Sequence, residues 1–259
     1  MASRGRQTIE GGPSLRREEA RPVSSLQKWA RTSGGINVAS GRSLISASLR
    51  EGIISGAIPS GEQLKQDELS DYFGVSPGPI REALRQLESE GLVRLYPNRG
   101  VFVTDVSPEE TVAVLLPVRF LLEKYAFQLL QGRLDEALAA TLQREVDTMQ
   151  RGADIHDVAM INEADVHFHE LVVESSGVYH TIQLWHSVLP RIRLQLYRLA
   201  PRHIDLNEVP TEHRDLLEAL RGKDPDHLAA VLEEHIIGTS ASLLDRRNTD
   251  DTPRGRRGR

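Results

Sequence analysis

The chain has 259 residues, with 32 lysines and arginines against 37 aspartates and glutamates, which gives a formal net charge of −5. Apolar residues make up 39% and charged residues 27%, a composition typical of a globular protein. The absence of cysteine excludes disulfides, thiolate catalysis, zinc fingers and iron–sulfur clusters. No apolar run approaches the roughly 20 residues that cross a bilayer, and the polar N-terminus does not resemble a secretory signal. We therefore expect a cytoplasmic protein without a membrane partner.

Charge is unevenly distributed along the chain. Residues 1–39 and 246–259 each carry a net charge of +4, residues 40–106 carry −2, and residues 107–245 carry −11. Both ends are rich in Arg and Gly and lack a sustained apolar period, which predicts two disordered basic tails. Such tails are ordinarily solvated, and non-specific attraction to DNA phosphates is the alternative use of their charge.

Three short helices are predicted after the first tail. Apolar residues recur there at helical spacing, and a glycine follows each helix. Ser76 is placed to cap the third helix, with Pro77 in the first helical position, where its missing N–H costs no hydrogen bond. The predicted helical ranges are 44–56, 64–73 and 77–90.

A β-hairpin is predicted after the third helix. The short β-type runs 92–95 and 101–103 are joined by a turn, so residues 40–106 have the pattern of a winged helix-turn-helix. A helix fits the DNA major groove, and Arg81, one turn into the third helix, is placed to bind a guanine through two hydrogen bonds. Arg99, at the hairpin tip, is placed to reach phosphate or the minor groove. Periodicity alone leaves a small helical domain with solvated arginines equally open.

Several short motifs of this segment occur with their turns and glycines in register. They are 49–56, 61–64, 68–70, 73–76, 79–84, 87–93 and 98–100. Together these motifs resemble the N-terminal domain of GntR-family bacterial regulators. The resemblance implies a dimeric transcription factor that binds a short palindromic operator in double-stranded DNA. The DNA contacts it implies are Ser76, Arg81, Arg85, Asn98, Arg99 and Gly100.

The DNA-reading segment also departs from the family pattern at three positions. The family often has Arg and then Thr where this chain has Pro77 and Gly78, and it often has a basic residue where Asp67 stands. Contacts to bases or phosphates are therefore missing, so we expect an operator that differs from the commonest half-site of the family.

Residues 107–245 show helical periods and no strand alternation. Ser107 and Pro108, followed by two acidic residues, are typical of a helix start. Glycines 132, 152, 177 and 222 and Pro201 fall at the predicted breaks. The pattern predicts a mainly α protein, with an all-helical bundle as its second domain. The predicted helices are 108–131, 134–151, 155–176, 178–199, 208–221 and 225–245.

One histidine-containing segment of the bundle differs from the rest. Asp165 and His169 are four apart on a predicted helix, so they project from one face and could bind one divalent metal together. His213 and His235 each accompany the apolar stripe of a later helix. From these residues alone, satisfied core histidines are the more common explanation. Five further histidines are isolated and are expected at surface or capping positions: His156, His180, His186, His203 and His227.

The bundle contains a further set of motifs: Arg119 with Glu123, Asp165 with Phe168 and His169, His213 with Leu217 and Ala219, and His235 with Ile236. This set resembles the FCD ligand-binding domain of the FadR-like branch. The resemblance implies that Asp165, His169, His213 and His235 hold a Zn, Ni or Mn ion at the floor of a pocket. Val178 stands where the family commonly has Asn, which bears on the local turn and not on the ligands.

A site of three histidines and one aspartate can keep a coordination position open for the carboxylate of an effector. Arg119, and Arg191 or Arg193 on the fourth helix, are placed to supply the balancing guanidinium groups, and Arg119 and Arg191 are expected in the pocket. The alternative for Arg119 is a surface ion pair with Glu123, worth only about 0.3–0.5 kcal/mol. The usual effectors of the family, small organic acids or sugar acids, fit a pocket of this kind.

These patterns lead to one preferred hypothesis and two alternatives. The preferred hypothesis is a homodimeric transcriptional regulator, expected to be a repressor and not an enzyme, whose operator affinity changes when a small carboxylate effector binds beside the metal. In the first alternative the ion itself is the signal. In the second, the metal activates water in a hydrolase fused to a DNA-binding module, although no further acid or base stands at a telling spacing.

Overall fold

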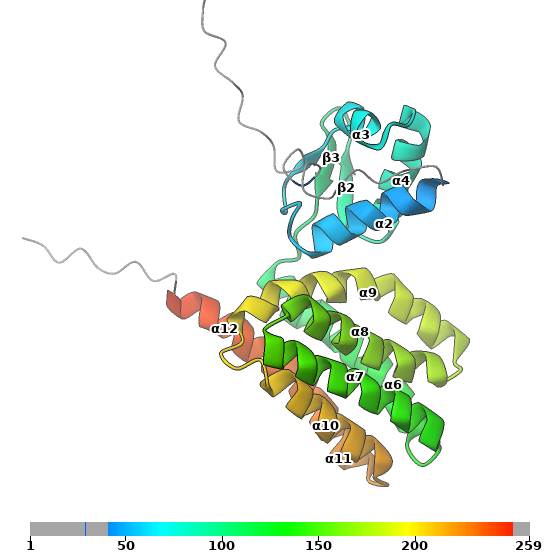
Figure 1. Cartoon of the computed structure of the whole chain (residues 1–259), viewed down its shortest axis with the longest axis vertical. Helices are drawn as coiled ribbons and strands as arrows, with labels where there is room; N and C mark the ends of the chain where they lie inside the picture. The colour runs from blue at the N-terminus through cyan, green and yellow to red at the C-terminus, as the bar shows by residue number, and fades with distance from the viewer. Residues whose placement is uncertain (1–28, 30–40, 251–259) are drawn as a thin grey trace, which may run out of the picture.

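A computed structural model describes Trp29 and residues 41–250. The chain forms two domains, a small one with three helices and a sheet, and a larger helical bundle (Figure 1). The predicted fold class is therefore confirmed. Most of the two predicted basic tails lies outside the described residues. None of the described helices combines the length and apolar character that spanning a bilayer requires.

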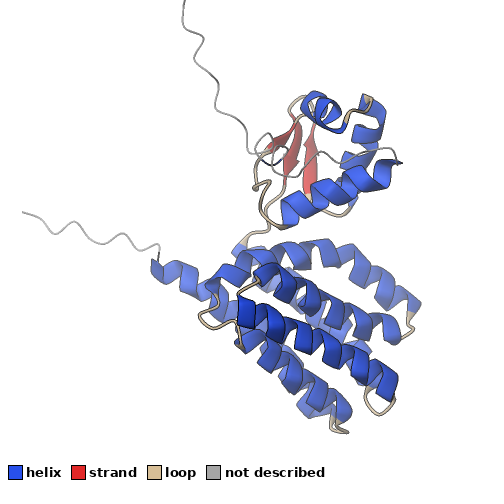
Figure 2. Ribbon diagram, in the orientation of Figure 1, coloured by secondary structure: helices blue, strands red, loops and turns tan. Residues whose placement is uncertain are grey.

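The small domain is a winged helix-turn-helix. Its helices are α2 (Gly41–Ile54), α3 (Gln66–Phe73) and α4 (Pro77–Ser89), and its strands are β1 (Gln63–Leu64), β2 (Val93–Tyr96) and β3 (Gly100–Val103). The strands form an antiparallel sheet in the order β1-β3-β2, at one side of the helices (Figure 2). The predicted hairpin corresponds to β2 and β3.

Two local predictions in this domain need correction. Gln63 and Leu64 pair with β3 as a short strand, so the second helix begins at Gln66 and not at Leu64. A two-residue strand is too short to show an alternating pattern. Leu64 is apolar and precedes the apolar residues of α3, so it resembles the start of that helix. Ser76 does occupy the N-cap position of α4, but its hydroxyl accepts no capping hydrogen bond there.

Trp29 is an exception within the predicted N-terminal tail. Its side chain is 8% exposed and packs against Tyr72 and Phe73 of α3, with ring centroids 5.4 and 6.4 Å apart. Gly52 of α2 makes room for it, because a Cβ at this position would lie 2.8 Å from the indole nitrogen. Trp29 therefore belongs to the core of the small domain, together with apolar side chains of α2, α3 and α4.

The bundle buries one continuous apolar core that includes Phe127, Phe168, Trp185 and Leu217. Ser107 caps its first turn, as predicted, by accepting a hydrogen bond from the backbone N–H of Glu110. The main helices are α6 (Leu116–Leu130), α7 (Glu136–Ile155), α8 (Val158–Ser175), α9 (Tyr179–Leu199), α10 (Glu208–Arg221), α11 (Pro225–Glu233) and α12 (Thr239–Asp250). The short segments are α5 (Pro108–Glu110), the π-helical turns η1 (Thr111–Leu115) and η3 (Glu234–Gly238), and the 3-10 turn η2 (Ala200–Arg202).

The boundaries of the bundle helices differ from the prediction at three places. Gly152 lies inside α7 and not at its end. A glycine is needed there because α8 packs closely against it: a Cβ on Gly152 would lie 2.8 Å from Cγ1 of Ile161. His156 ends α7 instead, in the left-handed conformation with φ of 58°. The π-helical turns interrupt the first and last predicted helices, and α12 continues to Asp250.

Helix α9 forms the junction between the two domains (Figure 1). Leu194 of α9 is buried in the apolar core of the small domain, not in that of the bundle. Arg198, one turn further along, binds Asp105 of the interdomain segment and Ser60 of the small domain. One helix of the bundle is thus fixed to the small domain by an apolar and an ionic contact.

Candidate metal centre and DNA-reading surface

The N-terminal half of α4 is exposed where sequence analysis placed the DNA-reading residues. Arg81 and Arg85, four residues apart on α4, are both exposed, as is Ser76 before the helix. The buried residues of α4, Ile80 and Leu84 among them, fix the helix against α2 and α3 and leave the arginines on the outer face. This face has the geometry of a recognition helix.

The hairpin tip, or wing, projects Arg99 from a constrained turn. Asn98 has φ of 61° and Gly100 has φ of 103°, and a Cβ on Gly100 would lie 2.8 Å from the side-chain nitrogen of Gln63. That same nitrogen donates a hydrogen bond to the carbonyl of Arg99 at 2.8 Å. The Arg99 guanidinium lies 5.4 Å from the centroid of the Tyr96 ring, a cation–π contact. The wing therefore presents a cation on a rigid support.

In the bundle, the structure brings together the four residues that were predicted as metal ligands. Asp165 and His169 of α8, His213 of α10 and His235 of η3 each offer one ligand atom, and these atoms lie within 4.8 Å of one another. Nε2 of His169 is 3.1 Å from Nε2 of His235 and 3.6 Å from Oδ1 of Asp165. Nε2 of His213 is 3.8 Å from the same oxygen. We call these four residues the His–Asp cluster.

Each histidine of the cluster is oriented by an oxygen atom behind it. In every case the ring nitrogen Nδ1 faces a carboxylate or a backbone carbonyl, both acceptors, which favours the tautomer with the proton on Nδ1 and the lone pair of Nε2 toward the centre. This is the arrangement that orients histidine ligands of metal ions in proteins. The pairs are His169 with Glu123 Oε2 at 2.6 Å, His213 with the Val209 carbonyl at 2.8 Å, and His235 with Glu212 Oε2 at 2.7 Å.

The centre of the cluster lacks the partners that its buried atoms require. Oδ1 of Asp165 and Nε2 of His213 have no hydrogen-bond partner among the described residues. Nε2 of His169 and Nε2 of His235 face each other as two acceptors. A buried polar atom without a partner costs about 1–3 kcal/mol. One divalent cation would satisfy all four donor atoms, so the residues present fit a metal ion.

The charge state of the cluster also suits a cation. Burial opposes ionisation of Glu123, but Arg119 and His169 lower the pKa of its carboxyl group to about 2. Burial likewise opposes ionisation of Asp165, yet His213, His169 and Arg119 hold its pKa well below the usual range. Burial lowers the pKa of His169 to about 4, against the opposing effect of Glu123. Near neutral pH Asp165 and Glu123 are therefore ionised and His169 is neutral, the charge states that suit a bound metal ion.

Arg119 lies beside the cluster and is almost fully buried, with 2% of its surface exposed. Its Nε is 2.7 Å from Oε1 of Glu123, and its Nη2 is 3.9 Å from Oδ1 of Asp165. The ion pair with Glu123 therefore forms, but it is buried and not at the surface as the alternative expected. Arg119 balances the charge of two buried carboxylates.

A small cavity of about 40 Å³ adjoins the cluster. Arg119, Asp165 and His235 line it, together with Asn162, whose side-chain nitrogen has no hydrogen-bond partner among the described residues. Arg191 does not line this cavity. It lies at the domain junction, with its guanidinium packed against Gly91. The structure thus separates the two arginines that were predicted to bind an effector.

Two interactions of the bundle were missed in the sequence. Glu212, interpreted there as a generic helix charge, holds His235 and also accepts a hydrogen bond from Thr239 at 2.9 Å. His186, interpreted as isolated, lies 3.3 Å from Glu174 and 3.4 Å from Glu170 on the exposed face of α8 and α9. Neither pair is close in sequence, so only the packing of the helices brings these groups together.

A winged helix-turn-helix joined to a helical domain with a buried polar cluster is the architecture of a DNA-binding regulator. Comparison with known families agrees with this class. Residues 42–103 match the family described as bacterial regulatory proteins, gntR family, and residues 114–238 match the FCD domain. The chain therefore belongs to the GntR family of transcriptional regulators, in the FadR-like branch with an FCD domain. This family consists of regulators and not enzymes, which removes the hydrolase alternative.

Individual relatives support the same assignment. The gluconate operon transcriptional repressor of Bacillus licheniformis is 29% identical over 225 residues, which cover 85% of this chain and 89% of that protein. The transcriptional repressor RspR of Escherichia coli K12 is 24% identical and covers 78% of this chain and 89% of its own length. The crystal structure of a GntR regulator from Rhodococcus sp. RHA1 has the same fold, with a TM-score of 0.68, 23% identity, and coverage of 79% and 97%.

Proposed function

We propose that the protein is a homodimeric transcriptional repressor whose operator affinity is controlled by a small organic acid bound beside a metal ion. The observation that carries this proposal is the His–Asp cluster, in which Oδ1 of Asp165 and Nε2 of His213 have no hydrogen-bond partner among the described residues, next to a cavity lined by Arg119. Repression is supported by the relatives named above, which are both described as transcriptional repressors.

The proposed cofactor is a divalent Zn, Ni or Mn ion held by Asp165, His169, His213 and His235. Three imidazole nitrogens and one carboxylate oxygen are ligands that suit these metals. When bound, the ion would supply an electrophilic position for an effector carboxylate. Arg119 orients Asp165 and contributes the second positive charge that an anion beside the cluster requires.

The size of the cavity supports a link between effector binding and movement. At about 40 Å³ it offers roughly the space of one water molecule. An organic acid therefore needs its walls to move apart, and Leu196 and Leu199 of α9 belong to those walls. Because Leu194 and Arg198 of the same helix are fixed to the small domain, displacement of α9 would reorient the recognition helix.

An exposed apolar stripe supports the proposed homodimer. Val114, Val118, Leu121 and Tyr125 are 37–68% exposed and recur at the spacing of one helix face along η1 and α6. Val188 of α9 lines one cavity together with Val114 and Val118, so the face continues onto a second helix. A symmetric pair of recognition helices would match the two half-sites of a palindromic operator.

The DNA-binding part of the proposal is tested with Arg81→Ala. We expect the variant to bind an operator fragment, recovered from genomic DNA by selection with the wild-type protein, about 5- to 150-fold more weakly in fluorescence anisotropy, which corresponds to about 1–3 kcal/mol. Arg133→Ala, an exposed arginine of the bundle, is the control and should bind normally. Retention of wild-type specificity by Arg81→Ala would contradict the assignment of the recognition helix.

The regulatory part of the proposal is tested by measuring the effect of the organic acid on DNA binding separately from the effect of the metal ion. Using Zn²⁺-loaded protein on the same fragment, we expect gluconate or another sugar acid to weaken binding while the metal stays bound, as native mass spectrometry would report. The small cavity also favours a second candidate function, in which the ion alone is the signal. In that case chelation would change the DNA affinity and no organic acid would have an effect.

A further inference from the structure

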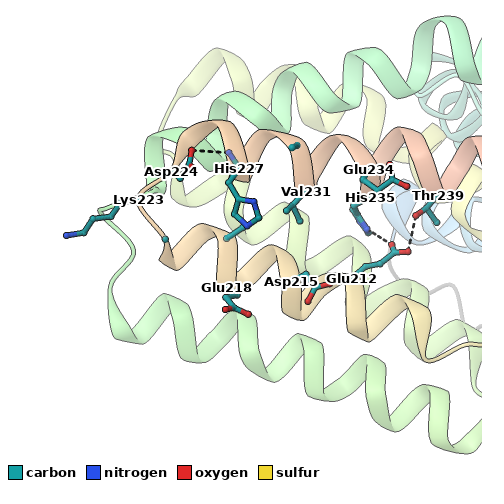
Figure 3. Close-up of a pocket in the computed structure, with 13 residues that line it drawn as sticks. Glu212, Asp215, Glu218, Lys223, Asp224, His227, Val231, Glu234, His235 and Thr239 are labelled. Atoms are coloured by element: carbon teal, nitrogen blue, oxygen red, sulfur yellow. Dashed lines mark hydrogen bonds and ion pairs between the residues drawn. The ribbon is translucent and has the colours of Figure 1, made fainter.

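A large groove lies between α10 and the α11–η3 segment, on the outside of the bundle (Figure 3). Its volume is about 790 Å³. Five carboxylates line it and only one lysine, Lys223, opposes them. The acidic residues are Glu212, Asp215, Glu218, Asp224 and Glu234. The groove runs from the loop before α11 to the turn that carries His235.

The inner end of the groove is also the wall of the small cavity beside the His–Asp cluster. Glu212, His235 and Thr239 line both spaces. Glu212 holds the other two residues, through Nδ1 of His235 at 2.7 Å and Oγ1 of Thr239 at 2.9 Å, as the dashed lines in Figure 3 show. A single layer of three side chains therefore separates the acidic groove from Asp165 and Arg119.

His235 is the most exposed histidine of the cluster. Its side chain is 8% exposed, against 1% for His169 and 0% for His213, and the Asp165 side chain is 7% exposed. The Glu212 side chain in front of it is 28% exposed. Because Nε2 of His235 faces the ring nitrogen of His169, one side chain connects the groove with the unsatisfied centre of the cluster.

We propose that this groove is the access route by which a hydrated divalent cation reaches the His–Asp cluster, with Glu212 as the carboxylate at its inner end. The proposal rests on the metal centre proposed above. A cleft lined by one sign of charge concentrates counter-ions and raises their association rate. The same carboxylates repel an acidic effector, which therefore reaches the small cavity from another side.

The turn that carries His235 has an irregular backbone, which suits the proposed access route for a cation. Residues Glu234–Gly238 form a π-helical turn, an irregularity that is frequent at functional sites. The carboxylate of Glu234 lies against Gly238, where a Cβ would be 2.5 Å from the carboxylate carbon. Glycine thus allows an acidic side chain to lie along the groove wall next to His235.

The first experiment measures the rate of metal uptake. Chelator-treated protein is mixed with Co²⁺ in a stopped-flow instrument at low salt, and the visible absorption of the bound ion is followed. The variant Asp215→Asn/Glu218→Gln/Glu234→Gln should take up Co²⁺ about tenfold more slowly, with an unchanged release rate. The difference should shrink as salt screens the groove. Asp67→Asn/Asp71→Asn/Asp245→Asn, with the same change in net charge at exposed sites elsewhere, should behave as wild type.

The second experiment obstructs the groove without changing its charge. Ala230 is an exposed residue of its lining, and Ala230→Trp should slow uptake and release of Co²⁺ by the same factor while the equilibrium occupancy stays at that of wild type. Ala140→Trp, at an exposed position of α7, is the control.

The outcomes separate the route from the metal centre. If the wild-type protein fails to bind one Co²⁺ per chain, both the metal centre and the route are overturned. If it binds one ion, and both groove variants take up Co²⁺ at the wild-type rate at low salt, the route alone is overturned. Slower uptake in the groove variants and not in their controls supports the route.

Discussion

Each histidine of the His–Asp cluster uses one ring nitrogen for the fold and keeps the other for a ligand. Glu123, the Val209 carbonyl and Glu212 fix the three rings from behind, so the cluster is oriented before any ion arrives. Such orienting groups typically change metal affinity by 10- to 100-fold when removed. The cost of this arrangement is a set of buried atoms without partners, and a bound ion should therefore stabilise the folded chain.

Replacement of His213 tests this at the residue scale. The His213 side chain is fully buried, and His213→Ala should lose the bound ion and with it the dependence of the melting temperature on metal. For the wild type, an ion present at 100 times its Kd should add about 2.7 kcal/mol to the free energy of unfolding. Calorimetry with and without chelator measures this difference. His180→Ala, at an exposed histidine, should keep the full metal effect, and a metal effect that survives in His213→Ala would refute the ligand assignment.

At the scale of elements, close packing decides where two of the bundle helices can meet. Helix α7 continues through Gly152, where α8 packs so closely that only a glycine fits. A Cβ at this position would lie 2.8 Å from Cγ1 of Ile161, 3.1 Å from the carbonyl oxygen of Asp157 and 3.2 Å from the backbone nitrogen of Ile161. Two of these three neighbours are backbone atoms, which cannot rotate away. The glycine is therefore a packing requirement and not a helix stop.

Gly152→Ala distinguishes packing from helix propensity by the sign of its effect. Propensity alone would stabilise the chain by about 1 kcal/mol. Overpacking against α8 costs about 1–3 kcal/mol, so we expect net destabilisation in urea unfolding. The reverse change at an exposed site of the same helix, Ala140→Gly, should cost about 1 kcal/mol through propensity alone. A more stable Gly152→Ala protein would show that the contact between α7 and α8 yields easily.

The sequence predicted most elements because long apolar stripes mark the bundle helices and glycines mark their ends. Strand β1 was missed because two residues carry no period, and the break at Gly152 was misplaced because a glycine marks close packing as well as a stop. The cluster could be predicted because Asp165 and His169 are one turn apart and the family resemblance supplied the two distant histidines. Glu212 could not, because its role depends on how α10 packs against η3.

For the whole molecule, the overall charge of −5 conceals a large difference in charge between the two domains. The −11 of residues 107–245 belongs to the bundle, where five carboxylates line a single groove, and the DNA-reading domain itself is slightly acidic. We therefore expect sequence-specific attraction to DNA to depend on a few exposed arginines of α4 and the wing. In the function proposed above, the acidic bundle would act on DNA through the position of α9, which contacts both domains, and not through its charge.

The basic ends of the chain are then expected to supply the non-specific attraction that the domains lack. Deletion of residues 1–28 and 251–259 removes ten basic and four acidic side chains and keeps Trp29, which packs in the small domain. We expect the shortened protein to bind all DNA sequences more weakly. The slope of log K against log salt should become shallower by about 0.9 for each phosphate that is no longer neutralised by a basic side chain. Anisotropy titrations at several salt concentrations measure this slope on operator and random DNA. An unchanged slope would mean that the tails do not bind phosphates, and weaker binding confined to operator DNA would mean that they read sequence.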